Sequence, residues 1–250
     1  MRNIVLCGFM GTGKTQLGKA LAQRLGLPFV DIDGEIERTT GMKIADIFEK
    51  MGEPFFRDLE EKLLREYGSK SGQIISVGGG ALQRESNITS LRQNGFLVCL
   101  FAKPQVILRR LRDDDTRPLL KSEDKLERIE SLLRLRFTNY LKADAFLDTS
   151  YKTIALCLDY LSSLTSLLYE GKIPLDFQKA PHRWAFCALE QNHEKLFQFL
   201  SDPDVSVRFT SAVKLWKSRI PIETKHFKTG RNIFLKWLLE EVEKIGDSSS

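Results

Sequence analysis

The chain has 250 residues, of which 42% are hydrophobic and 28% charged, with a net charge of +5; this is an ordinary globular composition with room for one large domain or two smaller ones. No apolar run reaches the roughly 20 residues of a membrane span, and the start leads into a Gly-rich loop too early for a signal peptide, so we expect a cytoplasmic protein without membrane contact. The four cysteines form no Cys-x-x-Cys pair and all three histidines follow residue 180, which argues against zinc motifs and against histidine-based nucleophilic schemes in the first 180 residues.

The first 160 residues alternate short apolar runs with amphipathic stretches, a pattern typical of a parallel sheet flanked by helices. The predicted strands are Asn3–Cys7, Pro28–Asp31, Gln73–Val77, Gly95–Phe101 and Ala145–Asp148. The predicted helices, which carry apolar residues at three- and four-residue spacing, are Lys14–Leu25, Ile44–Met51, Leu59–Tyr67, Gln105–Leu111, Lys125–Leu141 and Lys152–Tyr169. The predicted fold class is therefore α/β, with a doubly wound, five-stranded parallel sheet.

The pattern changes after Gly171, because no further strand candidate follows and two or three amphipathic helices run to a Ser-rich end. We predict an α/β domain at 1–170 and a smaller all-α region at 171–250. Part of this region resembles one HEAT-type helical hairpin, with Asp202-Pro203 in the turn and Val207-Arg208 opening the second helix. Since a single unit needs neighbours to bury its faces, residues 171–250 are a candidate surface for a protein partner or for self-association.

A phosphate-binding loop is predicted at Gly8–Thr15, whose sequence GFMGTGKT satisfies G-x-x-x-x-G-K-[ST] between a predicted strand and a predicted helix. Glycines let the backbone curl so that N–H groups face the phosphates, and the helix N-terminus adds positive potential. In such a loop Lys14 bridges the β- and γ-phosphates, and Thr15 ligates Mg²⁺ through its hydroxyl. The predicted nucleotide contacts are Gly11, Thr12, Gly13, Lys14, Thr15 and Gln16. A Gly-rich turn without a ligand is the alternative, which the strand–loop–helix order disfavours.

Two carboxylates, Asp31 and Asp33, end the second predicted strand. Because side chains alternate along a strand, we expect both to point to the same side. The carboxyl edge of an open α/β sheet borders the ligand crevice. One carboxylate can support the metal, directly or through water, and the other can accept a hydrogen bond from a substrate hydroxyl. A solvated strand end or a helix cap is the alternative.

Three further segments carry polar or glycine patterns. Arg57 and Glu60 are three residues apart, a spacing that lets the carboxylate hold the guanidinium, although an exposed helix ion pair would be favoured for this pair alone. Gly78–Gly80 follows a buried strand, where glycines allow a ligand to lie close to the backbone; a flexible loop is the alternative. The charged segment 112–118 is either a surface loop or a lid that closes to exclude water.

Together these features resemble the shikimate kinase family over about residues 1–165. The family's motifs occur in order and with matching spacing, as Gly8–Thr15, Asp31 and Asp33, Thr40–Ile44, Phe56–Glu60, Gly78–Gly80, Arg117–Leu120 and Arg136–Tyr140. The resemblance implies transfer of the γ-phosphoryl group of ATP to the 3-hydroxyl of shikimate, a step towards chorismate and the aromatic amino acids. It implies Mg²⁺ as the cofactor.

The resemblance also implies a role for each matched residue. Asp33 binds the substrate hydroxyls and acts as the base, while Arg57 and Arg136 bind the substrate carboxylate, for which a planar fork of donors is the natural partner. Gly79 gives shikimate a backbone contact, and Arg117 reaches the ATP phosphates from the lid. The expected catalytic residues are Lys14, Asp33 and Arg117, and the expected metal ligands are Thr15 and, directly or through water, Asp31.

The rival interpretations are another metabolite kinase of the gluconate kinase type, a nucleoside monophosphate kinase, or a degenerate kinase kept as a binding module with the helical tail as its working surface. The two enzyme classes should lack Phe-Arg-x-x-Glu joined to Gly-Gly-Gly, and a decaying site should have lost some of the matched charged residues. The positive charge fits arginines around an anionic substrate better than nucleic acid, since no basic stripe with interleaved aromatics occurs. No motif indicates which residue contacts adenine.

Overall fold

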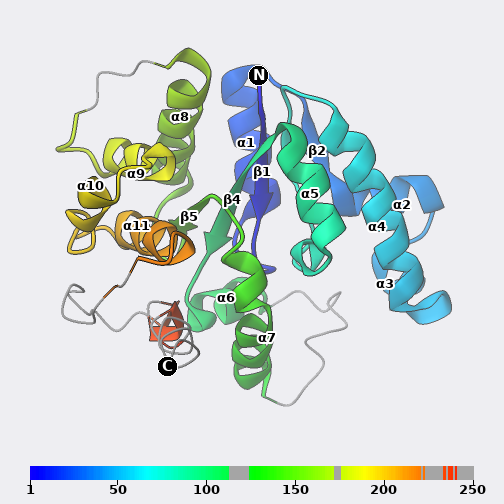
Figure 1. Ribbon diagram of the computed structural model, residues 1–250. Coiled ribbons are helices and arrows are strands. Elements are labelled where there is room, and N and C mark those ends of the chain that lie inside the picture. Colours follow the sequence, from blue (N-terminus) through cyan, green and yellow to red (C-terminus); the bar gives the residue numbers. More distant parts are fainter. Residues whose placement is uncertain are drawn as a thin grey trace. The chain divides into compact units, whose positions relative to one another are not determined.

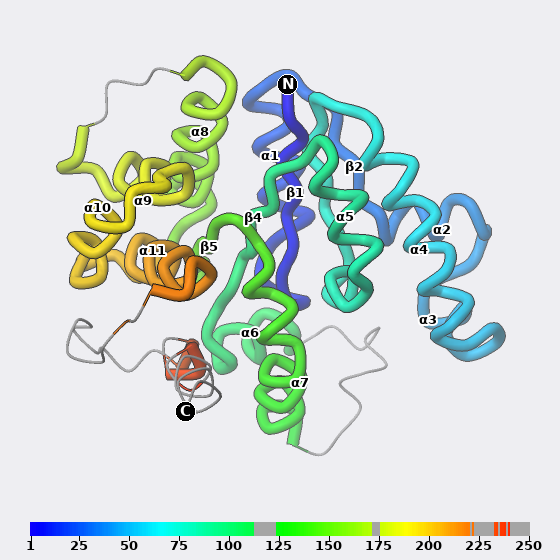
Figure 2. The backbone as a smooth tube through the Cα atoms, viewed as in Figure 1, coloured from blue at the N-terminus to red at the C-terminus, as the bar shows by residue number. Residues whose placement is uncertain are grey.

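The computed structural model of the chain describes residues 1–112, 124–171 and 176–220, together with 222, 233, 234, 236–238 and 240. Figure 1 and Figure 2 show the described elements in one orientation. Arg117 and the predicted lid motif lie outside the described residues. Among the helices that are described, none is long and apolar enough to cross a membrane.

Five strands form one sheet in the order β2-β3-β1-β4-β5. The strands are β1 (Asn3–Cys7), β2 (Phe29–Asp31), β3 (Ile74–Ser76), β4 (Gly95–Phe101) and β5 (Ala145–Asp148). In the centre, Val5 of β1 pairs in parallel with Ile75 on one side and Leu97 on the other. β1, β3 and β4 are buried along their whole length, as expected of parallel strands covered on both faces. The predicted five-stranded parallel sheet is confirmed, with bounds shifted by no more than one residue.

Helices alternate with these strands along the chain and continue after β5. Those before β5 are α1 (Lys14–Leu25), α2 (Ile32–Thr40), α3 (Ile44–Lys50), α4 (Gly52–Ser69), α5 (Glu85–Asn94), α6 (Pro104–Arg110) and α7 (Lys125–Tyr140), with a 3-10 turn η1 (Ala81–Gln83). Those after β5 are α8 (Ile154–Glu170), α9 (Ala180–Leu189), α10 (His193–Phe197) and α11 (Val205–Lys217). α2, α3 and α4 pack on one another at the right of Figure 1, and α4 also packs along α5. The expected C-terminal helices are present.

The prediction that Asp31 and Asp33 end one strand is wrong, and with it the strand alternation from which a common direction of the two side chains was expected. β2 ends at Asp31, and α2 begins at Ile32, so the chain changes from a two-residue to a 3.6-residue repeat between the two carboxylates. Asp33 lies in the first turn of α2, where a negative charge complements the positive end of the helix.

The chain divides into two compact units, residues 1–143 with 149–158 and residues 144–148 with 159–250. The first unit contains β1 to β4 and α1 to α7. The second contains β5, the later part of α8, and α9 to α11, with Trp184, Phe209 and Leu215 among its fully or nearly fully buried side chains. Within it α11 packs against α9, α10 and β5. The predicted boundary near residue 171 stays a prediction.

Candidate active site

The loop between β1 and α1 has the backbone of an anion site. Gly8 has a φ of 124°, and a Cβ there would lie 2.0 Å from the carbonyl oxygen of Leu100, so only glycine fits. The Lys14 ammonium lies over the loop and donates to the carbonyls of Gly8 at 2.9 Å and Phe9 at 3.0 Å. An ammonium, a curled loop and a helix N-terminus therefore meet where a phosphate chain would bind.

A pair of oxygen ligands lies at the start of α1. The Thr15 hydroxyl donates to Oδ2 of Asp31 at 2.9 Å, which joins the phosphate loop to the end of β2. Hydroxyl and carboxylate oxygens suit Mg²⁺, which usually completes its octahedron with water and substrate phosphates. The two predicted metal residues therefore lie together, and their chemistry fits that ion.

A cavity of about 860 Å³ opens beside the loop. Its lining comes from the phosphate loop, the α2 to α4 helices, the glycine turn after β3, and α7. The predicted site residues in this lining are Gly11, Gly13, Lys14, Thr15, Gln16, Asp33, Arg57, Gly79 and Arg136. Residues predicted to bind phosphate thus face residues predicted to bind the acceptor across one cavity.

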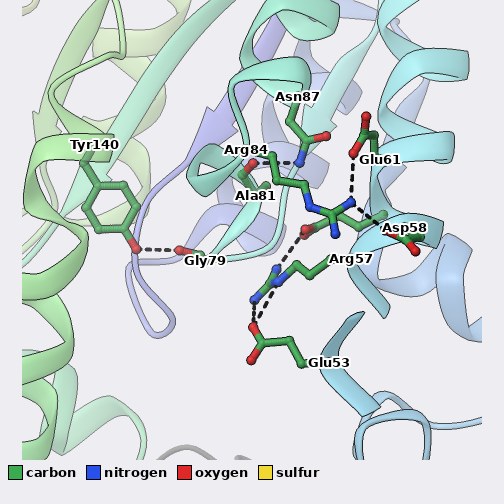
Figure 3. A network of polar contacts seen from close by, with 10 residues as sticks. Glu53, Arg57, Asp58, Glu61, Gly79, Ala81, Arg84, Asn87 and Tyr140 are labelled. Carbon is green, nitrogen blue, oxygen red and sulfur yellow. Dashed lines mark hydrogen bonds and ion pairs between the residues drawn. The ribbon is translucent and has the colours of Figure 1, made fainter. Parts of the chain in front are cut away.

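Arg57 is held on α4 by carboxylates on either side of it in the sequence (Figure 3). Its Nη1 donates to Glu60 at 2.8 Å, and its Nε and Nη2 both donate to Oε1 of Glu53 at 3.1 and 3.0 Å. A guanidinium has five N–H groups, so one on each terminal nitrogen has no partner among the described residues. Two N–H groups of one guanidinium can bind both oxygens of a carboxylate. Glu53 was not singled out by the sequence motifs, although its i,i+4 spacing to Arg57 is a recognisable signal.

Glu60 is a buried carboxylate with hydrogen-bonding capacity left. Its side chain is 0% exposed, and its Oε1 has no hydrogen-bond partner among the described residues. Burial raises the pKa of the Glu60 carboxyl, and the charge on Arg57 partly offsets that rise. Asp33 adds to the rise, because a second negative charge nearby disfavours ionisation.

The glycine turn at Gly78–Gly80 packs against charged side chains of the cavity, three of which are Asp33, Arg57 and Arg136. A Cβ on the first glycine would lie 2.9 Å from Oδ1 of Asp33, on the second 3.3 Å from Nη1 of Arg136, and on the third 2.5 Å from Nη2 of Arg57. None of these three glycines has a positive φ. Glycine is therefore needed here for close approach of the side chains rather than for backbone conformation.

Arg136 and Tyr140 are one turn apart on α7, and both are buried. The Tyr140 hydroxyl donates to the carbonyl of Gly79 at 2.7 Å (Figure 3). Burial raises the pKa of Tyr140 well above its usual range, so the phenol stays protonated and keeps this bond. The late arginine–tyrosine motif thus contributes one cavity cation and one group that fixes the glycine turn.

A second cavity of about 470 Å³ lies on the phosphate loop, lined by Thr12, Gln16, Arg110 and Thr149 among others. Arg110 Nη1 donates to the carbonyl of Gly11 at 3.0 Å and to the Thr149 hydroxyl at 3.1 Å. The Thr149 hydroxyl donates in turn to the carbonyl of Thr12 at 3.0 Å. Neither Arg110 nor Thr149 belongs to a motif, and only the fold brings them to the loop.

Comparison with known proteins identifies the family to which the chain belongs. The sequence model of the shikimate kinase family matches residues 10–165. The chain belongs to the shikimate kinase family. Among its relatives, the shikimate kinase of Thermodesulfovibrio yellowstonii is 48% identical over 149 residues, which are 60% of this chain and 86% of that protein. The shikimate kinase of Caldicellulosiruptor bescii is 42% identical over 164 residues, which are 66% of this chain and 95% of that protein.

Solved shikimate kinases have the same fold. The enzyme from Acinetobacter baumannii in complex with shikimate is 36% identical, with a TM-score of 0.63, over 69% of this chain and 96% of that one. The enzyme from Bacteroides thetaiotaomicron is 33% identical, with a TM-score of 0.61, over 66% and 99%. These shikimate kinases are matched almost completely, whereas about a third of this chain remains unmatched. The family match ends at residue 165, so α9 to α11 lie outside it.

Proposed function

We propose that the chain transfers the γ-phosphoryl group of ATP to the 3-hydroxyl of shikimate, giving shikimate 3-phosphate and ADP, in the cytoplasm and on the route to the aromatic amino acids. The observation that carries the proposal is one cavity, in a member of the shikimate kinase family, lined by the phosphate loop and by Asp33, Arg57 and Arg136. A solved relative is described as a complex with shikimate, which supports the choice of acceptor.

On the phosphate side, Lys14 and the loop N–H groups bind the β- and γ-phosphates. Thr15 and Asp31 would hold Mg²⁺, which would supply positive charge against the phosphate oxygens. The second cavity takes the rest of the nucleotide, with Arg110 as the planar group nearest the base. Arg117, outside the described residues, is proposed to reach the phosphates as part of a lid.

On the acceptor side, Asp33 orders the attacking hydroxyl and removes its proton. The hydroxyl oxygen forms the new bond to the γ-phosphorus, the bond from that phosphorus to the β–γ bridging oxygen breaks, and ADP leaves with the electron pair. Arg57 presents its two remaining N–H groups to the shikimate carboxylate, and Arg136 supplies a second cation. Holding the carboxylate at one end of the cavity fixes which hydroxyl faces the phosphate.

A coupled assay of ADP release tests this proposal, with shikimate, gluconate, AMP or no acceptor as parallel arms. We expect turnover with shikimate alone, and mass spectrometry of the product should show one added phosphoryl group. Turnover with gluconate or AMP instead of shikimate would show that the proposed acceptor is wrong. ADP release at the same rate without any acceptor would indicate an ATPase. Binding of a protein partner or a second copy through residues 171–250 stays a prediction.

A further inference from the structure

The strand β5 is the last in the sheet order, so one of its two edges has no neighbouring strand among the residues that the structure describes. Along a strand, the N–H groups of residues i and i+2 point to the same edge. An uncovered edge of this kind pairs readily with a strand from another chain. Phe146 and Asp148 are such a pair of residues on β5.

Side chains from the C-terminal helices bind these backbone groups. The Ser206 hydroxyl accepts from the N–H of Asp148 at 3.0 Å, and the Thr210 hydroxyl accepts from the N–H of Phe146 at 3.1 Å. The indole Nε1 of Trp184 donates to the carbonyl of Phe146 at 2.8 Å. Two successive donors and one acceptor on the same edge of β5 are thus bound by side chains of α9 and α11.

The spacing of the two hydroxyls matches the spacing of the strand. Ser206 and Thr210 are four residues apart on α11, which is a rise of about 6 Å. Phe146 and Asp148 are two residues apart on β5, which is about 6.6 Å. A helix lying beside the strand can therefore serve both N–H groups from one face. Figure 2 shows α11 next to β5.

These polar side chains are completely buried, with Ser206, Thr210 and Trp184 each 0% exposed. An apolar side chain at either hydroxyl position would leave a buried N–H without a partner, which is unfavourable. The ring of Phe209, between the two hydroxyls in the sequence, packs edge-on against Phe146 with centroids 5.1 Å apart. α11 therefore contacts β5 both through hydrogen bonds and through packing of apolar side chains.

The start of α11 is fixed by further contacts within the same unit. Asp204 caps the helix by accepting from the N–H of Ser206 at 2.8 Å, and it also accepts from the Tyr160 hydroxyl of α8 at 2.7 Å. Arg183 of α9 donates to the buried Asp202 in the preceding turn at 2.6 Å. Residues of α8 and α9 therefore both hold the N-terminal end of α11 in place.

We propose that α9 to α11 form an intramolecular cap that occupies the open edge of β5, in the place that β5 of a second copy of the chain would otherwise take. The segment binds the backbone groups that a neighbouring strand would otherwise bind. The face of α11 that carries Ser206 and Thr210 therefore packs within the same chain and is not a surface for a partner. This role goes beyond the proposed phosphoryl transfer and does not depend on it.

Hydrogen exchange in the full-length chain tests the contacts. The double variant Ser206→Ala with Thr210→Val removes both hydroxyl acceptors while keeping nearly the same side-chain volume. We expect the amides of Phe146 and Asp148 to exchange about tenfold faster or more than in the unsubstituted chain. Unchanged protection of both amides would overturn the proposal.

The matched control is the double variant Ser163→Ala with Thr165→Val on α8. Among the described residues, the two hydroxyls that it removes donate to carbonyls of their own helix, Ser163 to Asp159 at 2.7 Å and Thr165 to Ser162 at 2.9 Å. It removes the same two chemical groups from the same unit, so exchange at β5 should stay as in the unsubstituted chain. Equal acceleration in both variants would mean general loosening and would also overturn the proposal.

A second variant tests the protection against pairing. Thr210→Lys places an ammonium against the buried strand edge and should displace α11. We expect the β5 amides to lose protection and the mass from light scattering to rise with protein concentration, in contrast to the unsubstituted chain. Exposed β5 amides in a particle of unchanged mass, or amides still protected, would refute the cap. If this variant does not fold, as judged by circular dichroism, the hydroxyl variant decides alone. Neither readout uses kinase activity.

Discussion

Replacing Gly80 with alanine perturbs the position of Arg57 without removing any side chain that is proposed to bind a ligand. Gly80 has a φ of −108°, which any residue adopts, so the backbone accepts the change. The added Cβ would lie 2.5 Å from Nη2 and 2.8 Å from Nη1 of Arg57. Both distances are shorter than a real carbon contact, so the guanidinium has to move.

The size of the effect follows from how firmly that guanidinium is held. Increasing the shortest distance from 2.5 Å to 3.0 Å, the least that real Cβ atoms show, displaces the fork by about 0.5 Å. Three hydrogen bonds to Glu53 and Glu60 and a side-chain exposure of only 10% oppose this movement. A misplacement of about 1 Å can reduce a rate by about 100-fold. We therefore expect kcat/KM for shikimate to fall by about tenfold or more, or about 1.4 kcal/mol.

Steady-state kinetics of Gly80→Ala, with each substrate varied in turn, measures the fall in kcat/KM for shikimate. The KM for ATP should change little, because the side chain that the added Cβ displaces, Arg57, is assigned to the acceptor and not to the nucleotide. Gly34→Ala on α2 is the matched control, since its Cβ would meet only an ordinary contact at 3.7 Å and alanine is the better helix former. Wild-type kinetics for Gly80→Ala, or an equal loss for both substrates, would refute the placement of Arg57 at the shikimate carboxylate.

The remaining predictions concern the charged groups of the cavity. Lys14→Ala or Thr15→Ala should reduce kcat by at least about 100-fold without changing the circular dichroism spectrum, and near-normal turnover would exclude the phosphate loop from catalysis. Asp33→Asn should lower kcat by about 100-fold or more with a smaller change in KM, because the base is lost while the shape is kept; an effect on KM alone would limit this residue to binding. Arg57→Lys and Arg136→Lys should each raise the KM for shikimate about tenfold and spare ATP in isothermal titration, since lysine keeps the charge and loses the fork. Weaker ATP binding in either variant would contradict the assignment of these arginines to shikimate.

The central sheet and the phosphate loop could be predicted because local sequence determines them. β1 and β4 are continuous apolar runs, and the loop needs glycine where the backbone has a positive φ or touches Leu100. Such constraints show in the sequence as residue types at fixed spacing. Gly78–Gly80 could also be recognised from residue type and spacing. There, glycine is required because charged side chains from other helices approach the backbone closely.

α2 and α5 could not be predicted from apolar periodicity. Each has only two buried aliphatic side chains, Ile32 and Ile36 in α2 and Ile88 and Leu91 in α5. With so few apolar positions, a helical repeat is hard to distinguish from a polar loop. Because α2 was not predicted, Asp33 was assigned to the end of a strand, whereas it lies in the first turn of that helix.

Other site features depend on contacts between segments far apart in the chain. Arg110 reaches Gly11, 99 residues away, and no motif marks either end of that contact. Ser206 and Thr210 resemble the polar positions of any amphipathic helix until β5 is placed beside them. Pairing of a helix with a strand edge has no sequence signature of its own, because the strand contributes only backbone groups.

Arg57 and Glu60 in the first unit differ from the hydroxyls bound to β5 in the second unit in how many of their hydrogen-bonding groups remain available. In the first unit, Arg57 keeps two N–H groups and Glu60 keeps one carboxylate oxygen without a partner among the described residues. Buried polar atoms normally find partners, so these point to a ligand with an anionic end and hydroxyl groups. In the second unit, Ser206 and Thr210 use their hydroxyls on β5. Substitutions at the first set should therefore change kinetic constants, and substitutions at the second set should change amide exchange and assembly.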